Sequence, residues 1–228
     1  LGLFLFHFSR DCSILATMVK LTVRKERSGP VRGFHPWVFS KALRSIPEGL
    51  VPGEPVELCD ESGSFLASGY FNSYGQISVR LWGYEKDEPV GTDFFVRRLE
   101  RAADIRRRYV ERPGTNAYRL INGESDLIPG LIVDRYGDHL VVQFHTRGME
   151  RWKTEVVESL VAVFGPRGIW ERSDVSVRNI ENLGAVRGLL HGSVPDAIEI
   201  AENGLRFLVD IKEGQKTGFF LDQRDKRS

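Results

Sequence analysis

The sequence predicts an α+β protein in which a small β-barrel is followed by a mixed α/β domain. Between residues 51 and 85, short apolar runs alternate with turns that contain Gly, Asn and Asp. Several short strands at such close spacing are typical of a small barrel. From residue 91 onward, two stretches with apolar residues three and four apart are interleaved with strand-like runs. That interleaving predicts a domain of mixed helices and strands.

The composition narrows the class of protein. The chain has 228 residues, a length that fits one or two domains with a sizeable core. A charged fraction of 28% with a net charge of +1 excludes a basic tail and a disordered acidic chain. No apolar run approaches the ~20 residues of a membrane-spanning helix. Because two cysteines, Cys12 and Cys59, do not make a disulfide framework, we expect a cytoplasmic protein.

The first seventeen residues are expected to lie outside the fold. They begin without Met and lack the positively charged start of a secretory signal. Because Met18 looks like a natural start, we expect residues 1–17 to be a non-native leader. An amphipathic membrane anchor is the alternative.

The barrel is expected to consist of short strands with alternating apolar residues. The first strand is predicted over residues 19–27, and a turn follows at Gly29 and Pro30. The sequence from His35 to Phe39 is expected to start a short helical or turn segment that ends by Pro47. The later strands are predicted at Val56–Cys59, Phe65–Ala67, Gly69–Phe71 and Ile77–Trp82.

Two amphipathic helices are predicted in the second domain, over residues 93–110 and 149–163. The apolar stripe of the first consists of Phe95, Leu99, Ala102, Ile105 and Tyr109. A hairpin turn at residues 202–204 leads into an apolar strand over residues 205–211. The other predicted strands are Tyr118–Ile121, the hairpin of Leu131–Asp134 and Leu140–Phe144, Gly168–Arg172 and Ala197–Ile200.

Positive charge is concentrated in two places although the total is nearly neutral. Between residues 18 and 47, seven Lys and Arg residues stand against a single acid, Glu26. Between residues 97 and 112, seven arginines stand against three acids. Local positive fields of this kind favour phosphate-rich partners. For one arginine-rich helix taken alone, the alternative is that its charged face is simply exposed to solvent and binds no partner.

The sequence contains no clear catalytic or metal-ligating set. Gly214–Thr217 resembles the end of a phosphate-binding loop but lacks the glycines at the required spacing. The five histidines are scattered, and no Cys or His pair has ligand spacing. Cys59 lies in a predicted strand, which favours a buried structural thiol over a nucleophile. Turn capping or pairing with arginine is favoured over acid–base catalysis for two carboxylate pairs, Glu124 with Asp126 and Glu171 with Asp174.

A histidine and a tryptophan lie among cations in the first part of the chain. Cations bind phosphates and flat rings stack on bases, so this combination on a small barrel predicts an RNA-binding surface. Burial of Trp37 in the core is the alternative. The residues of the predicted surface are Arg24, Lys25, Arg27, Arg32, His35 and Trp37.

Four segments of the chain resemble one family, the class I S-adenosylmethionine-dependent methyltransferases that make 5-methylcytosine in 23S ribosomal RNA. The resemblance spans roughly residues 20–227, and its second and fourth segments are long and specific. The segments are Val31–Ser40 in part, Tyr118–Gly137, Glu171–Arg178 and Leu208–Arg227.

The resemblance implies a PUA-like RNA-binding barrel over residues 18–90 and a central α/β domain over residues 91–205. Residues 206–228 would be the first segment of a Rossmann-like methyltransferase domain, truncated at its entry. The implied cofactor is S-adenosylmethionine and the implied partner is 23S ribosomal RNA, with no membrane and no metal; a homodimer is left open. The resemblance makes five residues candidate contacts for the cofactor: Thr217, Gly218, Phe219, Gln223 and Arg224.

The chemistry of the family needs groups that this sequence lacks. A Cys thiolate must attack C6 of cytosine so that C5 can accept the methyl group. Neither Cys12 nor Cys59 lies in a matching context, and no Gly-rich cofactor loop follows the last segment. We therefore expect no catalytic residue in this chain and no methyl transfer by it alone. Without the rest of that domain, the apolar residues 219–221 are expected to be exposed, which favours disorder or self-association.

The sequence thus predicts the N-terminal part of an rRNA methyltransferase, which docks RNA and supplies the edge of the cofactor site. The alternative is a free-standing PUA-type RNA-binding module without catalytic activity.

Overall fold

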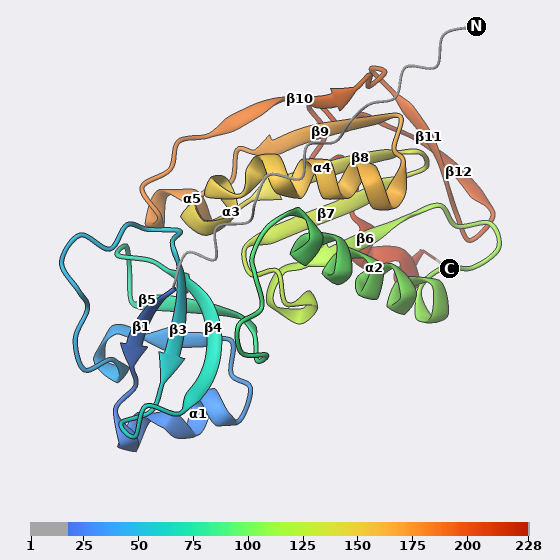
Figure 1. Cartoon of the computed structure of the whole chain (residues 1–228). Coiled ribbons are helices and arrows are strands. Elements are labelled where there is room, and N and C mark those ends of the chain that lie inside the picture. Colours follow the sequence, from blue (N-terminus) through green and yellow to red (C-terminus); the bar gives the residue numbers. More distant parts are fainter. Residues whose placement is uncertain (1–17, 228) are drawn as a thin grey trace, which may run out of the picture.

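Two five-stranded sheets organise the chain, and two helices cover one face of the second sheet (Figure 1). The computed structural model describes residues 18–227. The predicted leader at residues 1–17, with Cys12, lies outside the described residues. Within the part of the chain that is described, no helix is long and apolar enough to cross a membrane.

The first sheet encloses a core of its own, filled mainly by buried Val and Leu side chains. Its strand order is β1-β3-β4-β5-β2, with β1 parallel to β3 and the other neighbours antiparallel. Backbone hydrogen bonds from Arg24 N to Ala42 O (2.8 Å) and from Arg44 N to Thr22 O (2.9 Å) join β1 to the segment after β2. The strands are β1 (Val19–Thr22), β2 (Trp37–Phe39), β3 (Pro55–Cys59), β4 (Phe65–Phe71) and β5 (Ile77–Gly83).

Two expectations for this part of the chain are wrong. The strand predicted over residues 19–27 ends at Thr22, and helical turns follow at Lys25–Arg27 (η1) and Ser28–Arg32 (α1). The segment that was expected to be helix or turn from His35 is strand β2, which pairs with β5 before the turn Ser40–Ala42 (η2). Because β5 is remote in sequence and β2 has only three residues, local periodicity could not reveal this pairing.

The second sheet has the strand order β10-β9-β8-β7-β6. Its neighbours are antiparallel except β8 and β9, which are parallel and are connected through two helices as parallel neighbours require. The elements are α2 (Thr92–Tyr109), β6 (Ala117–Asn122), η3 (Gly123–Asp126), β7 (Leu131–Tyr136), β8 (His139–Phe144), α3 (Arg147–Arg151), α4 (Lys153–Phe164), β9 (Gly168–Ser173), α5 (Val177–Ile180) and β10 (Val186–Gly192).

Helix α2 confirms the first predicted helix but not the whole of its apolar stripe. The first three residues of the stripe are buried in the core shared with α4 and the second sheet. Ile105 and Tyr109 are instead 38% and 74% exposed. Arg106 is buried in the last turns, where it bonds to Asp126. The end of the helix therefore presents apolar and aromatic groups to solvent.

The second predicted helix is divided into α3 and α4 at Trp152, and its apolar residues Val156 and Leu160 are buried. Strand β10 and the short helix α5 were not predicted. Strand β10 lies at the edge of the sheet and alternates between half-buried and exposed residues, so it lacks the strong apolar pattern of a central strand.

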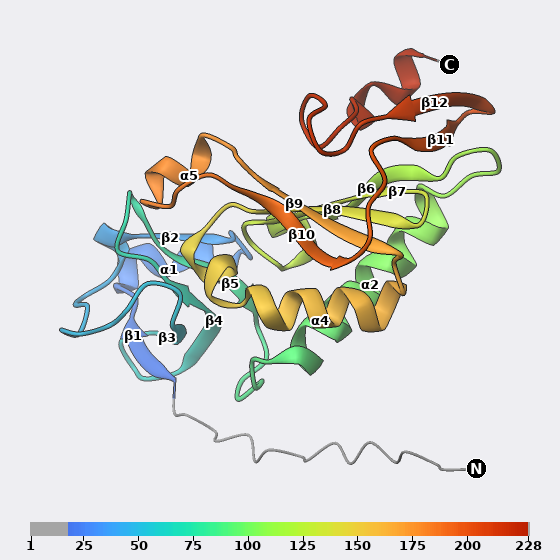
Figure 2. The ribbon, with the colours of Figure 1, turned by 90° about the horizontal axis from the view of Figure 1, so that it is seen from above.

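The C-terminal part of the chain packs on the face of the second sheet that α2 and α4 leave free (Figure 2). It consists of the hairpin β11 (Ile198–Glu202) and β12 (Leu205–Val209), followed by turns and the 3-10 helix η4 (Leu221–Lys226). The expected exposure of residues 219–221 is wrong, because all three are half-buried. Phe219 and Leu221 pack against a core that the central sheet itself provides.

The two sheets are joined by aromatic packing. Tyr70 and Trp82 of the first sheet are fully buried in the core of the second domain. The Trp82 ring lies edge-on to Phe94, with ring centroids 5.2 Å apart. The Tyr70 hydroxyl donates to Pro129 O (2.9 Å). The surfaces of the two domains are therefore held in one arrangement.

Candidate functional site

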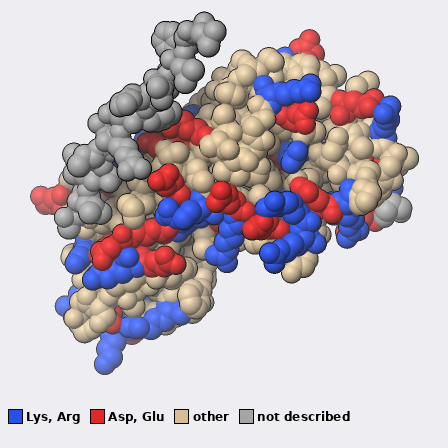
Figure 3. Space-filling view, turned by 45° about the vertical axis from the view of Figure 1, so that its right-hand side comes forward, with Lys and Arg blue, Asp and Glu red and all other residues tan. Residues whose placement is uncertain are grey.

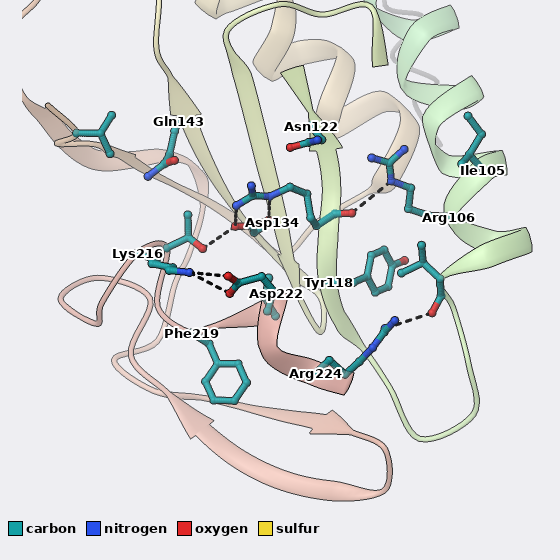
Figure 4. A pocket seen from close by; sticks show the side chains of 15 residues that line it. Ile105, Arg106, Tyr118, Asn122, Asp134, Gln143, Lys216, Phe219, Asp222 and Arg224 are labelled. Carbon is teal, nitrogen blue, oxygen red and sulfur yellow. Dashed lines mark hydrogen bonds and ion pairs between the residues drawn. The ribbon is translucent and has the colours of Figure 1, made fainter. Parts of the chain in front are cut away.

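A cavity of about 650 Å³ lies between α2, the second sheet and the C-terminal segment (Figure 4). Three of the five predicted cofactor contacts line it: Thr217, Phe219 and Arg224. They come from the segment that follows β12, and they face residues of α2, β6 and β7. The fold thus brings this segment to a hollow even though the segment itself contains little regular structure.

The Thr217 side chain belongs to a buried hydrogen-bond network. Its hydroxyl donates to Asp134 Oδ2 (2.6 Å), and Asp134 also accepts from Arg119 Nε (2.9 Å) and Nη2 (3.0 Å). Because that one hydroxyl hydrogen is used, the Tyr136 hydroxyl is the donor in its 2.8 Å contact with Thr217 Oγ1. Burial raises the pKa of Tyr136, which keeps this donor neutral. Thr217 therefore positions the segment against β7.

The other predicted cofactor contacts differ in their placement. Phe219 faces the cavity while its ring packs 5.1 Å from the Phe207 ring. Arg224 Nη1 reaches Val110 O (3.5 Å) across the cavity. Gly218 has a φ of +129°, a conformation that favours glycine, and Gln223 is exposed outside the cavity lining.

Several polar residues of this cavity were not identified as site residues from the sequence. Gln143 is buried, donates to Arg172 O (3.0 Å) and contacts His145 Nε2 through its own Oε1 (3.1 Å). Burial lowers the pKa of His145 to about 4, and the charge of nearby Arg119 adds to the shift. Asn122 lies at the end of β6 with its amide at the cavity. The two cavity residues, Gln143 of β8 and Asn122 of β6, come from separate strands, so only the fold brings them together.

The mouth of the cavity is bordered by the ion pair of Lys216 with Asp222 (2.9 Å). Tyr118 forms part of the wall, where burial and a hydrogen bond to Glu111 raise its pKa to about 12. Three cations that line this cavity are thus paired within the protein: Lys216 with Asp222, Arg106 with Asp126 and Arg119 with Asp134.

The carboxylates that the sequence analysis assigned to capping and pairing are paired with cations. Asp126 accepts from Arg106 Nη1 (2.6 Å) and Nη2 (2.7 Å). Glu171 accepts from Lys153 Nζ at 3.0 Å. Cys59 is buried in β3, as expected of a structural thiol, and burial raises its pKa. Among residues 18–227, no cluster of three or more His, Cys, Asp or Glu residues is placed to hold a metal ion.

A second candidate surface lies on the first sheet, around β2. Trp37 is 37% exposed and Phe39 is 44% exposed, so the burial of Trp37 in the core is excluded. The His35 ring stands edge-on to Trp37, with centroids 6.0 Å apart. Together with Arg27 and Lys41, these rings line a cavity of about 490 Å³. We call Arg27, His35, Trp37, Phe39 and Lys41 the β2 face.

The remaining cations of the predicted RNA-binding surface lie outside this cavity. Arg24 donates from Nε to Leu43 O (3.2 Å), and Arg32 pairs with Asp60 (2.6 Å). Lys25 is exposed on η1. The structure therefore brings Arg27, His35 and Trp37 together and directs Arg24 and Arg32 to partners within the protein.

Comparisons with known proteins match one part of the chain to a domain family and most of the chain to full-length relatives. Residues 21–83, which hold most of the first sheet, match the family of PUA-like domains. The chain is 44% identical over 208 residues to "Ribosomal RNA large subunit methyltransferase I" of Tolumonas auensis, covering 90% of this chain and 52% of that protein. The protein of the same name from Aliivibrio fischeri is 44% identical over 210 residues, which cover 92% of this chain and 53% of that protein.

Solved structures show the same fold. A protein from Streptococcus mutans, described as a candidate SAM-dependent methyltransferase, superimposes with a TM-score of 0.77 at 24% identity. The match covers 92% of this chain and 53% of that protein. The chain thus spans about half the length of the curated relatives it matches. Over nine-tenths of its length, the chain is similar to proteins named ribosomal RNA large subunit methyltransferase I, and its first sheet is similar to the PUA-like domain.

Proposed function

We propose that this chain docks ribosomal RNA and supplies one edge of the cofactor site in an S-adenosylmethionine-dependent rRNA methyltransferase. The relatives are named for rRNA methylation of the large subunit, and the resemblance points to C5 of a cytosine in 23S rRNA. The observation that carries the proposal is the β2 face, where a half-exposed Trp37 stands among cations on a PUA-like domain. The cytoplasm, where ribosomes are made, is the proposed compartment.

The β2 face has the groups that RNA recognition uses. Unstacked RNA bases bind to flat side chains, and their phosphates bind to Lys and Arg. Trp37 is held by its indole Nε1, which donates to Glu124 Oε1 (2.8 Å), and by the Arg80 guanidinium 5.8 Å from its ring centre. A ring that is fixed before binding loses little conformational freedom when a base stacks on it.

The cofactor edge is proposed at the cavity beneath α2. Phe219 offers an aromatic surface of the kind that a flat adenine packs against, and Arg224 offers a cation for the carboxylate of S-adenosylmethionine. Thr217 and Gly218 hold the segment in place rather than touching the cofactor with free polar groups. The chain contains no cysteine in a catalytic context, so we propose that these 228 residues alone do not transfer a methyl group.

Trp37 is the residue to change in order to test RNA docking. With unmodified 23S rRNA transcribed in vitro, Trp37→Ala is expected to weaken binding about fivefold or more, because a stacking surface is lost. Trp37→Phe keeps a flat ring and is expected to retain most of the affinity. Filter binding measures both. Equal affinities for the wild type and Trp37→Ala would count against the β2 face as the docking surface.

Cofactor binding separates the methyltransferase from the alternative, a free-standing RNA-binding module. Equilibrium dialysis with labelled S-adenosylmethionine is expected to detect binding that Arg224→Ala weakens. The matched control is Lys226→Ala, since Lys226 lies on the same 3-10 helix but outside the cavity lining. RNA binding without any cofactor binding would favour the module.

A further inference from the structure

One face of α2 combines exposed cations with an exposed aromatic ring. With about 100° of rotation per residue, Arg101, Ile105, Arg108 and Tyr109 fall within about 100° of one another around the helix axis. Arg101 and Arg108 are exposed, and Ile105 and Tyr109 are 38% and 74% exposed. We call these four residues the α2 face. Its apolar and aromatic members are those that the sequence pattern assigned to the core.

The two arginines of the α2 face have no ionic or hydrogen-bond partner among residues 18–227, unlike most of their neighbours. Arg97 and Arg98 bind Glu88, and Arg106 binds Asp126. Acids three or four residues away on a helix can form ion pairs with such arginines. Arg101 and Arg108 instead form a positively charged stripe along the exposed side of α2.

The acidic residues of α2 and the loop after it do not neutralise this stripe. Asp104 is paired with Arg107. Glu111 accepts a hydrogen bond from the Tyr118 hydroxyl. Glu100 lines a different hollow, together with residues 162–164 at the end of α4. A ligand that met the α2 face would therefore meet two guanidinium groups that no acid among residues 18–227 binds. Its complement is a phosphate-bearing chain.

Contacts of η3 and of Ile105 link helix α2 to the two sites already described. The turn η3 connects them, since Glu124 binds Trp37 of the β2 face (2.8 Å) and Asp126 binds Arg106 of α2 (2.6 Å). Ile105 belongs both to the α2 face and to the lining of the cavity beneath the helix. Figure 3 shows Lys and Arg side chains gathered along the lower side of the molecule, interspersed with acids.

We propose that the α2 face is a second RNA-contacting surface, which binds phosphates through Arg101 and Arg108 and stacks a base on Tyr109. This inference rests on the proposed function, because it extends the docked RNA from the β2 face past η3 to the edge of the cavity. One RNA held at both places would be fixed across the junction of the two domains, next to the proposed cofactor edge.

The test is the salt dependence of binding to unmodified 23S rRNA transcribed in vitro. The double variant Arg101→Gln/Arg108→Gln is expected to bind more weakly, and the negative slope of log K against log salt is expected to become shallower by about 1.4, because two phosphate contacts are lost. The matched control is Arg167→Gln/Arg206→Gln, which removes the same charge from exposed positions outside α2, on the loop before β9 and on β12. It is expected to change the slope little.

Tyr109 gives an independent readout. Tyr109→Ala is expected to weaken binding about fivefold or more at every salt concentration without changing the slope, because stacking is not ionic. The inference is overturned if Trp37→Ala weakens binding while the α2 variants bind like the wild type, and that outcome leaves the proposed function standing. If the unaltered chain binds no RNA, the proposed function is overturned together with the inference. Thermal unfolding followed by circular dichroism checks that each variant is folded.

Discussion

Asp134 is the residue through which the C-terminal segment is attached to the central sheet. Its carboxylate is 1% exposed and accepts hydrogen bonds from both Thr217 and Arg119. A buried carboxylate is tolerated when such donors compensate for the lost hydration. The network therefore keeps Phe219 and Arg224 at the cavity, although neither of them belongs to a strand or an α-helix.

At the residue scale, we predict how much protein stability decreases when the Thr217 hydroxyl is removed. Thr217→Val is expected to lower the free energy of unfolding by about 1–3 kcal/mol, because the Tyr136 hydroxyl loses its acceptor and Asp134 loses a donor. Thr217→Ser keeps the hydroxyl and serves as the control. Urea unfolding measures the difference. If the Val and Ser variants were equally stable, the network would not hold the segment.

The site residues that could be predicted from the sequence were those of local motifs. The segment containing Thr217, Phe219 and Arg224 was found by its resemblance to a family, and it does lie at a cavity. Asn122 and Gln143 were missed as site residues because they reach the cavity from different strands. No spacing in the sequence marks residues that meet only after the sheet has formed.

At the scale of elements, the contact between α3 and β4 fixes the two domains against each other. Gly148 of α3 lies against the Tyr70 ring of β4, where an added Cβ would come within 2.4 Å of two ring atoms. The ring cannot move away easily, because Tyr70 is fully buried and its hydroxyl is bonded to Pro129 O. The glycine is needed for this close approach.

Gly148→Ala is therefore expected to destabilise the protein by about 1–3 kcal/mol, the usual cost of overpacking a filled core. The control is Gly29→Ala in α1, where nothing lies within 4 Å of the added Cβ. The midpoint of thermal unfolding should fall for the first variant and stay near that of the wild type for the second. An unchanged midpoint in Gly148→Ala would show that the two domains tolerate separation at this contact.

Elements with a strong periodicity of their own were predicted best. Helix α2 was predicted within a residue or two at each end, since its apolar residues recur along 18 residues. Strands β2 and β10 were not predicted, because a three-residue strand and a half-exposed edge strand obtain their stability from remote partners, β5 and β9. Ile105 and Tyr109, in the last turns of α2, were predicted on the apolar face of the helix but are exposed to solvent, because the helix extends beyond the end of the core.

At the scale of the whole molecule, a line of candidate contacts runs across both domains. The β2 face belongs to the first sheet and the α2 face to the second domain, and η3 bonds to Trp37 of the β2 face and to Arg106 of helix α2. Aromatic packing between Trp82 and Phe94 keeps their relative placement fixed. An RNA bound along this line would have its path set by the fold before any cofactor is bound.

The central claim is that ribosomal RNA lies along this line, and ultraviolet cross-linking tests it most directly. The bound complex with unmodified 23S rRNA is irradiated, and the protein peptides attached to nucleotides are identified by mass spectrometry. Cross-links are expected within residues 34–39, which contain the exposed Trp37 and Phe39, and at Tyr109. Cross-links confined to β10 or to the β11–β12 hairpin, with none at these aromatic residues, would contradict the claim.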